Sequence, residues 1–492
     1  MITAMRNLSD RLYSAEQVRL LDHIAITEFG IPGHELMARA GRGAFEELRR
    51  RWPAVRRIAV LCGGGNNGGD GYVVARLART AGLEAQVFAT LMPDQLKGEA
   101  AGAAREALDA GVHVSGLPRS LEGFDVAVDA VLGSGTRGAP TGAAHEAIAL
   151  MNASGLPVFA LDLPSGLNPD TGCVPGEAVH AAATVCFIGL KVGLFTGQGP
   201  DHAGAVLLDD LDAPPAIHER VTPVALRLRE SEGLGPRVRS THKGHYGHVL
   251  VIGGDFGTPG AARMAAEAAL RVGAGLVTIA TRPEHTTAMI AGRPELMVHG
   301  VSGPDDLVPL LARTTLVAIG CGLGTDAWGR GLLRKVLESA APKVVDAAAL
   351  SLLAAEPVRR DDWVLTPHPG EAARLLHCTG VDVQRDRLCA AAEIAARYGG
   401  TVVLKGAGTV VQSPDSGPVI CTRGNPGMAS GGMGDVLTGV IAGLAAQGLA
   451  LPAAARAGVC LHACAADAAA ADGERGLLAT DLLPHLRCLV NQ

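Results

Sequence analysis

Three aspartates stand where buried strands are expected to end or a helix to begin, and glycine-rich sequence lies beside each of them. Asp129 closes the run DVAVD and precedes GSGTRG, Asp162 closes VFALD and precedes PSGLN, and Asp435 closes GNPGMASGGMGD. A carboxylate can accept a proton from a substrate, while the backbone N–H groups of glycine turns can hold an anion. The pattern indicates acid–base chemistry on an anionic ligand. For each aspartate alone, a cap on the following turn or helix is the alternative.

The segment GGGNNGGDG at 63–71 follows the strand-like run RRIAVLC and opens a helical pattern. Free backbone N–H groups at the start of a helix suit a phosphate. The segment is not a Walker A loop, because it lacks the GK[ST] ending, and it is not a strict GxGxxG motif. A structural turn is the alternative, but such a turn rarely needs so many glycines with two asparagines and an aspartate. We interpret the segment as anion-binding.

Further candidate contacts lie in the second half of the chain. The run VVLKGAGTVV at 402–411 is expected to form a strand–turn–strand hairpin whose Lys405 lies along a nucleotide. In LTPHPGE, His368 stands between two prolines, and GCGLGTD at 320–326 ends a strand with glycines that let a ligand approach the backbone. A lone histidine is often structural or merely exposed, so His368 is a candidate only in this context.

The elements that position these residues follow from length and pattern. The 492 residues are enough for two or three domains of about 100–200 residues each. Hydrophobic residues make up 48% and charged residues 19%, which is typical of a globular chain. The net charge of −6 and the 3% of aromatic residues argue against binding to nucleic acid or to an anionic membrane.

Two blocks repeat the same order of a short apolar strand, a glycine turn and an alanine- and leucine-rich helix. Strands without two-fold alternation are buried on both faces, which predicts parallel sheets covered by helices. We therefore predict an α/β protein with two doubly wound domains, at 1–222 and 236–492, joined by a proline-rich and charged linker at 223–235. The opening segment is expected to be helical, with Ser14 and Gln17 forming a capping box.

The ten cysteines are scattered without a disulfide pattern, which indicates a reducing compartment. The polar N-terminus lacks the apolar core of a secretory signal, so a cytoplasmic protein is expected. The alanine-rich stretch near the C-terminus is interrupted by polar residues, which favours a pair of packed helices over a membrane span. The segment CLHAC is a poor metal motif, because Cys460 and Cys464 share a helix face while His462 points away. The basic cluster RRRWPAVRR fits a solvated helix end.

The first half resembles the NAD(P)HX epimerase, which is the N-terminal domain of the YjeF family. The segments GIPGHELMARAG, GGGNNGGDGY, DAVLGSGTRG, LDLPSGLNPDTG and FIGLKVGLFTGQG carry the resemblance over residues 10–212. It implies a K⁺ site of Asn67, Asp129 and Ser165, whose oxygen atoms suit a hard cation. It also implies that Asp162 acts as acid/base at the hydrated nicotinamide ring. The residues that it places around the dinucleotide are Asn66, Asn67, Gly68, Gly69, Asp70, Gly133, Ser134, Gly135, Thr136, Arg137, Gly138, Ala139 and Asp162.

The second half resembles the ribokinase-like superfamily and, more closely, the ADP/ATP-dependent NAD(P)HX dehydratase of the YjeF C-terminal domain. The segments HKGHYGHVLVIGG, LTPHPGEAARLL, LKGAGT and GNPGMASGGMGD carry it over residues 240–490. The resemblance implies a Rossmann-like first domain, a ribokinase-like second domain, and ADP with Mg²⁺ as co-substrate. The nucleotide contacts that it implies are Lys405, Gly406, Ala407, Gly408, Thr409 and Gly434. It places the hydrated dinucleotide near Ala261, Gly324, His368 and Asp435, with Asp435 as the base.

The two halves in this order resemble the bifunctional members of the family. The expected function is repair of hydrated NADH and NADPH, by epimerisation at C6 and ADP-dependent dehydration of the S epimer. We expect a homo-oligomer that acts on small molecules. The alternatives are a ribokinase-like kinase for a vitamin precursor fused to a nucleotide-binding module, and a dinucleotide-sensing module without turnover. A stable phosphorylated product would favour the kinase.

Overall fold

The computed structural model describes residues 9–135, 138–228, 233–414 and 416–492. The chain divides into an N-terminal unit, Met1–Leu226, and a C-terminal unit, Arg227–Gln492. This division falls inside the segment 223–235 that we predicted as a linker. The segment contains a strand, β10 (Ala225–Leu228), which pairs antiparallel with β1 (Arg11–Tyr13).

The N-terminal unit is built on a parallel sheet with the strand order β4-β3-β2-β5-β6-β7-β9. The order reverses between β2 and β5, where Leu61 pairs with Asp129. In such sheets, a ligand binds beyond the carboxyl ends of the strands at this switch point. The strands of this sheet are β2 (Arg57–Cys62), β3 (Glu84–Ala89), β4 (His113–Ser115), β5 (Val126–Ala130), β6 (Val158–Leu161), β7 (Ala183–Phe187) and β9 (Ala205–Asp209). The short strand β8 (Leu190–Lys191) lies outside this sheet and pairs parallel with β1.

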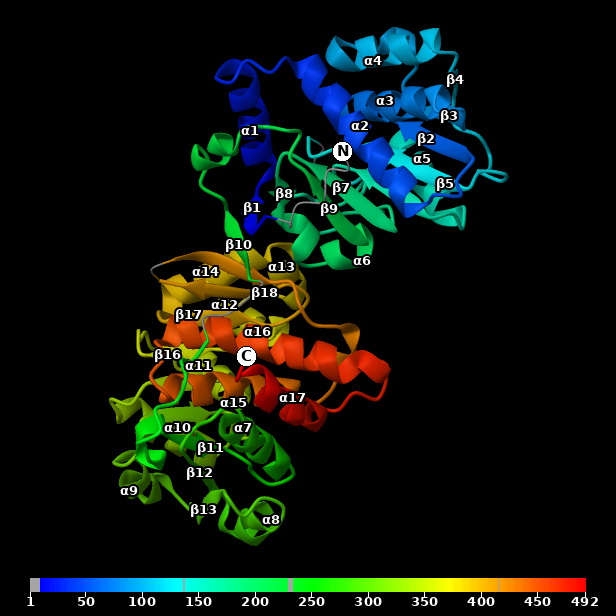
Figure 1. The fold of residues 1–492 in the computed structure, drawn as a ribbon. Coiled ribbons are helices and arrows are strands. Elements are labelled where there is room, and N and C mark those ends of the chain that lie inside the picture. Colours follow the sequence, from blue (N-terminus) through cyan, green and yellow to red (C-terminus); the bar gives the residue numbers. More distant parts are fainter. Residues whose placement is uncertain (1–8, 136–137, 229–232, 415) are drawn as a thin grey trace. The chain divides into compact units, whose positions relative to one another are not determined.

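Helices cover both faces of this sheet (Figure 1). On one face, the helices α1, α2, α3 and α4 share a core cluster with the side chains of Ile58 and Val60. On the other face, α5 shares a core cluster with Ala59 and Leu61. The predicted capping box of Ser14 and Gln17 is confirmed at the start of α1. The helices are α1 (Ala15–Thr27), α2 (Gly33–Arg51), α3 (Asn66–Thr80), α4 (Gly98–Asp109), α5 (Gly142–Ala153) and α6 (Gly199–Ala203).

In the C-terminal unit, the strands β11 to β17 form a parallel sheet. The strands β18 and β19 continue this sheet with antiparallel pairing. The order β13-β12-β11-β14-β15-β16-β17-β18-β19 reverses between β11 and β14, so a second switch point lies there. The strands are β11 (His248–Ile252), β12 (Leu276–Thr281), β13 (Met297–Gly300), β14 (Leu316–Ile319), β15 (Lys343–Val345), β16 (Trp363–Leu365), β17 (Thr401–Leu404), β18 (Thr409–Ser413) and β19 (Ser416–Cys421).

Because right-handed crossovers from the two halves of the sheet place helices on opposite faces, both faces are covered here as well. One core cluster joins α7, α15, α16 and α17, which lie together in Figure 1. The helices are α7 (Pro259–Arg271), α8 (Thr286–Ala291), α9 (Val308–Leu311), α10 (Ala327–Glu338), α11 (Ala347–Ala355), α12 (Pro369–Leu376), α13 (Gly380–Arg385), α14 (Arg387–Tyr398), α15 (Met433–Ala446), α16 (Leu451–Ala469) and α17 (Leu482–Leu489).

These topologies confirm the predicted doubly wound α/β architecture of both halves. The alanine-rich stretch near the C-terminus forms the packed helices α15 and α16, as expected. Within the described residues, none of the helices has both the length and the apolar character needed to cross a membrane.

The contact between α7 and α15 leads to a stability prediction. A Cβ atom on Gly439 of α15 would lie 2.0 Å from the backbone oxygen of Ala265 in α7. We expect Gly439→Ala to lower the free energy of unfolding by about 1–3 kcal/mol, because the helices must move apart. Gly331 in α10 has only ordinary contacts around a Cβ, the nearest at 3.7 Å. As the control, Gly331→Ala should raise stability by about 0.5–1 kcal/mol in the same urea titration. Equal effects of the two changes would contradict the packing argument.

Candidate active sites

The switch point of the N-terminal unit brings together the three residues predicted to bind K⁺. The Ser165 backbone N–H donates to Asp129 Oδ2 at 2.8 Å, and Ser165 Oγ donates to Asp129 Oδ1 at 2.6 Å. Asn67 Nδ2 donates to the carbonyl oxygen of Leu132 at 3.0 Å, and Ser165 Oγ lies 3.3 Å from the same oxygen. All three side chains are buried. The Leu132 carbonyl therefore links Asn67 to the Asp129–Ser165 pair.

Two observations at this cluster fit a cation with oxygen ligands. Asn67 Oδ1 is buried and has no hydrogen-bond partner in the described structure. Burial raises the pKa of the Asp129 carboxyl to about 6, although hydrogen bonds from Ser165 and Val131 oppose the rise. An unpartnered carbonyl oxygen and a desolvated carboxylate are both stabilised by a nearby cation. The residues present therefore fit the K⁺ ion that the family resemblance implies.

Asp162 occupies a strained position beside this cluster. Its φ of +66° lies in the left-handed region, which aspartate tolerates better than most residues but still at a cost. Its carboxylate forms an ion pair with Lys191 at Oδ1 and accepts a hydrogen bond of 3.3 Å from the Ser134 backbone N–H at Oδ2. The Lys191 side chain is fully buried, whereas that of Asp162 is 15% exposed. Asp162 therefore presents a partly accessible carboxylate that is held in one orientation.

Two more acidic groups surround this ion pair. Burial, and then the negative charges of Asp162 and Asp22, raise the pKa of the Asp70 carboxyl well above its usual range. Burial raises the pKa of Asp22 to about 6, and the charge of Lys191 opposes the rise. Although burial alone would lower the pKa of Lys191, the neighbouring Asp162 charge raises it. Lys191 and Asp22 were not singled out from the sequence, and Lys191 is the one cation of this cluster within the described residues.

The glycine-rich segment is arranged differently from a surface phosphate loop. The helix α3 begins at Asn66, so Asn67, Gly68, Gly69 and Asp70 lie in its first turns and are buried, and only Asn66 and the two glycines before it are exposed. A Cβ on Gly68 would lie 2.0 Å from the oxygen of Gly63, so this glycine is required for close packing. The start of α3 has no side-chain cap, which leaves backbone N–H groups for an anion.

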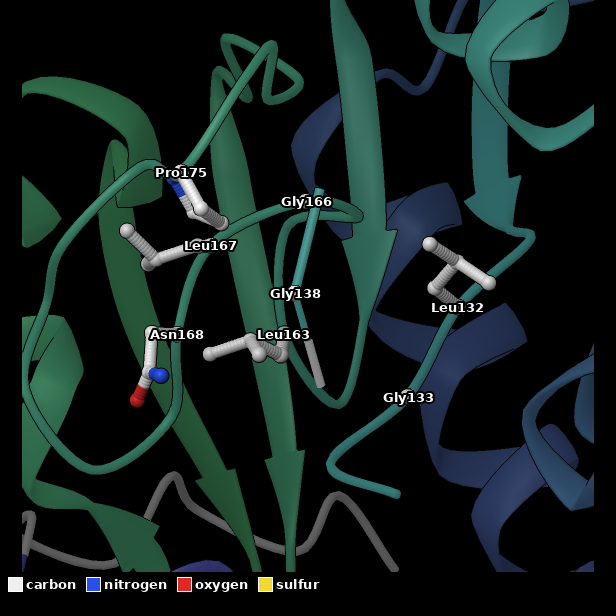
Figure 2. Close-up of a pocket in the computed structure, with 8 residues that line it drawn as sticks. All are labelled: Leu132, Gly133, Gly138, Leu163, Gly166, Leu167, Asn168 and Pro175. Carbon is white, nitrogen blue, oxygen red and sulfur yellow. The ribbon is translucent and has the colours of Figure 1, made fainter. Parts of the chain in front are cut away.

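The second loop predicted to contact the dinucleotide lies beside Asp162. Gly133 and Ser134 are half-buried, and Gly135, Gly138 and Ala139 are exposed. Thr136 and Arg137 lie outside the described residues. A cavity of about 10 Å³, room for a single water, lies where Gly133 and Gly138 approach Leu163, Leu167 and Asn168 (Figure 2). A hollow of about 530 Å³ near Leu96 and Leu108 includes none of the predicted site residues. Of the predicted contacts on this loop that the structure describes, Gly135, Gly138 and Ala139 are the exposed ones.

In the C-terminal unit, Asp435 lies in the first turn of α15, as predicted, and Gly432 at the start of the helix has a φ of +91°. Ligand atoms of Cys321, Asp346 and Asp435 lie within 4.8 Å of one another. Burial raises the pKa of the Asp435 carboxyl to about 6, and a hydrogen bond from the Cys321 thiol opposes the rise. Asp435 is therefore a carboxylate with raised basicity beside an uncapped helix N-terminus, which suits proton abstraction next to a phosphate.

Lys405 is turned toward carboxylates. Its Nζ lies 2.7 Å from Asp346 Oδ1 and 3.8 Å from Glu371 Oε2. Asp346 also accepts a hydrogen bond of 3.0 Å from Thr438 Oγ1 of α15. A Cβ on Gly434 would lie 3.2 Å from Lys405 Nζ, so this lysine lies against the start of α15. Asp346 and Glu371 were not singled out from the sequence, although Asp346 follows a strand in the same way as Asp129 and Asp162 do.

The remaining predicted contacts lie on turns of the same unit. The hairpin at 402–411 is confirmed as β17 and β18, and its turn exposes Gly406 and Ala407, with Gly408 and Thr409 half-buried. His368 caps α12: its Nδ1 accepts from the Gly370 backbone N–H at 3.0 Å, and Nε2 lies 3.3 Å from Glu371 Oε1. The histidine is about half exposed, so it is both a helix cap and an accessible polar group.

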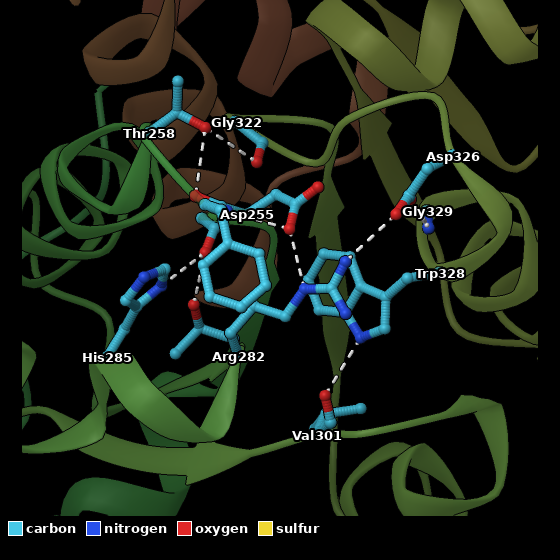
Figure 3. Close-up of polar contacts among 12 residues, drawn as sticks. Asp255, Thr258, Arg282, His285, Val301, Gly322, Asp326, Trp328 and Gly329 are labelled. Atoms are coloured by element: carbon cyan, nitrogen blue, oxygen red, sulfur yellow. Dashed lines mark hydrogen bonds and ion pairs between the residues drawn. The ribbon is translucent and has the colours of Figure 1, made fainter.

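Gly324 and Ala261 flank the second switch point. Gly324 follows β14 with a φ of +73°, and Ala261 lies in the first turn of α7, after β11. Between them, Asp255 holds Arg282, which also binds Asp326 and stacks on Trp328 (Figure 3). The structure thus places polar and aromatic side chains around the two turns of this switch point, one after β11 and one after β14.

Each unit matches one protein-family model. Residues 33–193 match the model described as YjeF-related protein N-terminus, and residues 249–487 match the model described as NAD(P)H-hydrate dehydratase. Over 98% of its length, the chain is 51% identical to the bifunctional NAD(P)H-hydrate repair enzyme Nnr of Coxiella burnetii and covers 99% of that protein. It is 45% identical to the enzyme of the same name from Escherichia coli, again over 98% of this chain and over 94% of that protein.

Among solved structures, the chain is similar to the ADP/ATP-dependent NAD(P)H-hydrate dehydratase of Bacillus subtilis co-crystallised with ATP and Mg²⁺. The sequence identity is 29% and the TM-score 0.47, over 53% of this chain and 94% of that one. A ribokinase-like superfamily protein of Enterococcus faecalis matches at 31% identity and a TM-score of 0.49, over 52% of this chain and 90% of that one.

Proposed function

Since the chain belongs to the family of bifunctional NAD(P)H-hydrate repair enzymes, we propose that its two units carry out the two steps of that repair. The N-terminal unit interconverts the C6 epimers of hydrated NADH and NADPH, and the C-terminal unit dehydrates the S epimer with phosphoryl transfer from ADP. The observation that carries the proposal is the presence, at each switch point, of a held and partly accessible carboxylate, Asp162 or Asp435.

For epimerisation, Asp162 is the acid and base. C6 of the hydrate carries both a hydroxyl and the ring nitrogen, so proton donation to the hydroxyl lets the nitrogen lone pair expel it as water. Return of water to the other face, with its proton taken by Asp162, inverts the centre. In the ring-opening route, the hydroxyl instead loses its proton to Asp162 as the C6–N bond breaks and the nitrogen gains a proton, and the reverse transfers close the ring on the other face. The buried Lys191 ammonium stabilises the ionised form of Asp162 between the two proton transfers.

For the ion of this unit, we propose K⁺ bound by Asn67, Asp129 and Ser165, which when present supplies positive charge near the reacting ring. In thermal melts, K⁺ at 100 times its dissociation constant should add about 2.7 kcal/mol of stability. Asn67→Ala removes the unpartnered oxygen and is expected to abolish the K⁺-dependent shift. Asn152→Ala, in which the lost amide donates to Glu177 and Ala178, should keep the shift. A full K⁺ shift in Asn67→Ala would rule out this ligand set.

For dehydration, Asp435 takes the proton of the C6 hydroxyl, and the resulting oxygen attacks the terminal phosphorus of ADP, whose bond to the bridging oxygen breaks so that AMP leaves. The C6–O bond then breaks with release of phosphate, while C5 loses a proton and the ring double bond forms. The N–H groups at the start of α15 hold the developing phosphate charge. The turn 406–409, of which Gly406 and Ala407 are exposed, lines the nucleotide together with Lys405. Mg²⁺ neutralises phosphate charge when bound, and Asp346 is the carboxylate beside Asp435 that would hold it.

The raised pKa of Asp435 gives a pH prediction. The base must be ionised, and a group with a pKa of about 6 is protonated as the pH falls through 6. The dehydration rate should therefore fall about tenfold per pH unit below pH 6. With an ordinary aspartate pKa near 3.9, the rate would instead stay unchanged down to about pH 4. A pH profile of kcat/KM for NADH recovery measures this. A profile that is flat between pH 5 and 7 would show that Asp435 is not the titrating base.

An isotope experiment tests the proposed function. NADH hydrated in H₂¹⁸O carries the label on its C6 hydroxyl. With ADP and Mg²⁺, and in parallel with ATP, the Asp162→Asn variant, in which epimerisation does not exchange this hydroxyl with solvent, should give NADH together with inorganic phosphate that contains one ¹⁸O per turnover. Unlabelled phosphate would show that the hydroxyl is not phosphorylated, and a stable phosphorylated product would indicate a kinase.

The homo-oligomeric state and cytoplasmic location expected from the sequence stay predictions, for sedimentation and cell fractionation to test.

A further inference from the structure

The turn between β11 and α7 has no role in the mechanism above, although it lies at the second switch point. The Asp255 backbone N–H donates to the oxygen of Gly322 at 2.6 Å, and the Gly254 N–H donates to the oxygen of Cys321 at 3.0 Å. The Cys321 thiol in turn donates to Asp435. The turn is therefore hydrogen-bonded to the loop that contacts the proposed catalytic base Asp435. This places the side chains of the turn near the substrate that we propose for this site.

The Asp255 carboxylate uses one of its two oxygens within the protein. Oδ1 accepts from Arg282 Nε at 2.7 Å and from the Phe256 backbone N–H at 2.8 Å. All hydrogen bonds of this carboxylate given by the described residues use Oδ1, and a Cβ on Gly324 would lie 2.5 Å from Oδ2. Although burial opposes it, the bond to Arg282 lowers the pKa of the Asp255 carboxyl. Oδ2 is thus an ionised acceptor that points to the glycine turn predicted to hold the substrate.

Phe256 adds a flat apolar surface at the same place. Its side chain is 60% exposed, which is unusual for a phenylalanine in a tightly bonded turn. The Arg282 guanidinium lies 4.9 Å from the ring centre, and the His285 ring packs against Phe256 in a T-shaped arrangement with the two ring centres 5.5 Å apart. Arg282 is itself fixed by its stacking on Trp328, at 4.2 Å (Figure 3). The ring is therefore held in place while much of its surface stays open to a ligand.

We infer that Asp255 and Phe256 recognise the carboxamide end of the hydrated nicotinamide ring. In the hydrate, the ring nitrogen, the remaining C2=C3 double bond and the carboxamide are conjugated and coplanar. That planar part stacks on the open face of Phe256, and its amide NH₂ donates to Asp255 Oδ2. These contacts fix the ring so that C6 faces Asp435. The inference rests on the proposed function, since it assigns a specificity determinant to the substrate of that site.

The test compares two substrates in the full-length protein: hydrated NADH and the hydrated 3-acetylpyridine analogue, in which a methyl group replaces the amide NH₂. The wild type should prefer the amide in kcat/KM for dehydration by about 10–100-fold, the size of one hydrogen bond to a charged acceptor. In Asp255→Asn, the side-chain oxygen must serve Arg282 and the Phe256 N–H, so the NH₂ group takes the place of Oδ2. That donor faces the amide NH₂, and the preference should vanish or reverse.

The matched control is Asp326→Asn, which alters the other carboxylate bound to Arg282, at 3.1 Å, and can still cap α10. It should keep the wild-type preference. Phe256→Ala should raise KM for both substrates, and Phe256→Tyr should restore it. Val381→Ala, at a position 69% exposed in α13, should leave KM unchanged.

The outcomes separate this inference from the proposed function. A wild-type preference retained in Asp255→Asn would overturn the carboxamide assignment. So would an equal loss with both substrates, which would indicate a contact to a ribose hydroxyl instead. If Asp255→Asn is unstable, an unchanged KM in Phe256→Ala overturns the stacking contact. Failure of the wild type to recover NADH from its hydrate would instead contradict the proposed function.

Discussion

Asp435→Asn is expected to lower the rate of NADH recovery from its hydrate by about 10²–10⁴-fold, the usual contribution of a general base. An asparagine fills the same space but cannot take the proton of the C6 hydroxyl. The start of α15 has no side-chain cap and keeps its N–H groups, so nucleotide binding should remain within a fewfold of the wild type. The decisive comparison is kcat for dehydration against the dissociation constant of ADP.

The control for this change is in the other unit. Asp162→Asn should lower epimerisation by a similar factor and leave the dehydration of purified S epimer intact. Equal losses of both activities in either variant would show that the two reactions do not use separate bases. A kcat in Asp435→Asn within threefold of the wild type would show that proton removal is carried out elsewhere.

Lys191→Met is expected to have the largest effect on stability. The lysine is fully buried beside Asp162. The charges of Lys191 and Asp162 also shift the pKa values of Asp70 and Asp22. Its removal leaves carboxylates in the interior without a cation, which costs about 3–5 kcal/mol in comparable buried pairs. Hydrogen exchange of peptides from the N-terminal unit under increasing urea measures the change. Part of the loss should be recovered at low pH, where the carboxyls become protonated.

The double variant Lys191→Met/Asp162→Asn separates stability from catalysis. Because both charges of the pair are removed, most of the lost stability should return, whereas epimerisation should stay abolished. A single Lys191→Met variant that is as stable as the wild type and still epimerises would contradict the assigned role of the ion pair.

Much of the local structure could be predicted because it depends on neighbours in the sequence. Short-range hydrogen bonds and turn geometry determine three features that were predicted: the capping box of Ser14 and Gln17, the hairpin at 402–411 and the position of Asp435 in the first turn of α15. The strand-end aspartates were found for the same reason, since a run of buried apolar residues ends visibly.

The partners of these residues could not be found in this way. Lys191 lies in the apolar run FIGLKVGLF, and nothing local indicates that its ammonium meets a carboxylate 29 residues earlier. Gly68 illustrates the opposite case. The sequence indicated that the glycines at the start of this helix offer backbone N–H groups to an anion, but the close contact with the Gly63 oxygen gives Gly68 a packing role. Asp346 could have been found, because it follows the strand KVV as Asp162 follows VFAL.

The most direct test follows a mixture of the two hydrate epimers with ADP and Mg²⁺ and records nicotinamide absorbance. The wild type should recover all of the NADH. Asp162→Asn should stop, after its rapid phase, at the fraction present as S epimer, and Asp435→Asn should recover almost no NADH during that phase. Complete rapid recovery by Asp162→Asn, or any rapid recovery by Asp435→Asn, would contradict the assignment of one acid to each half.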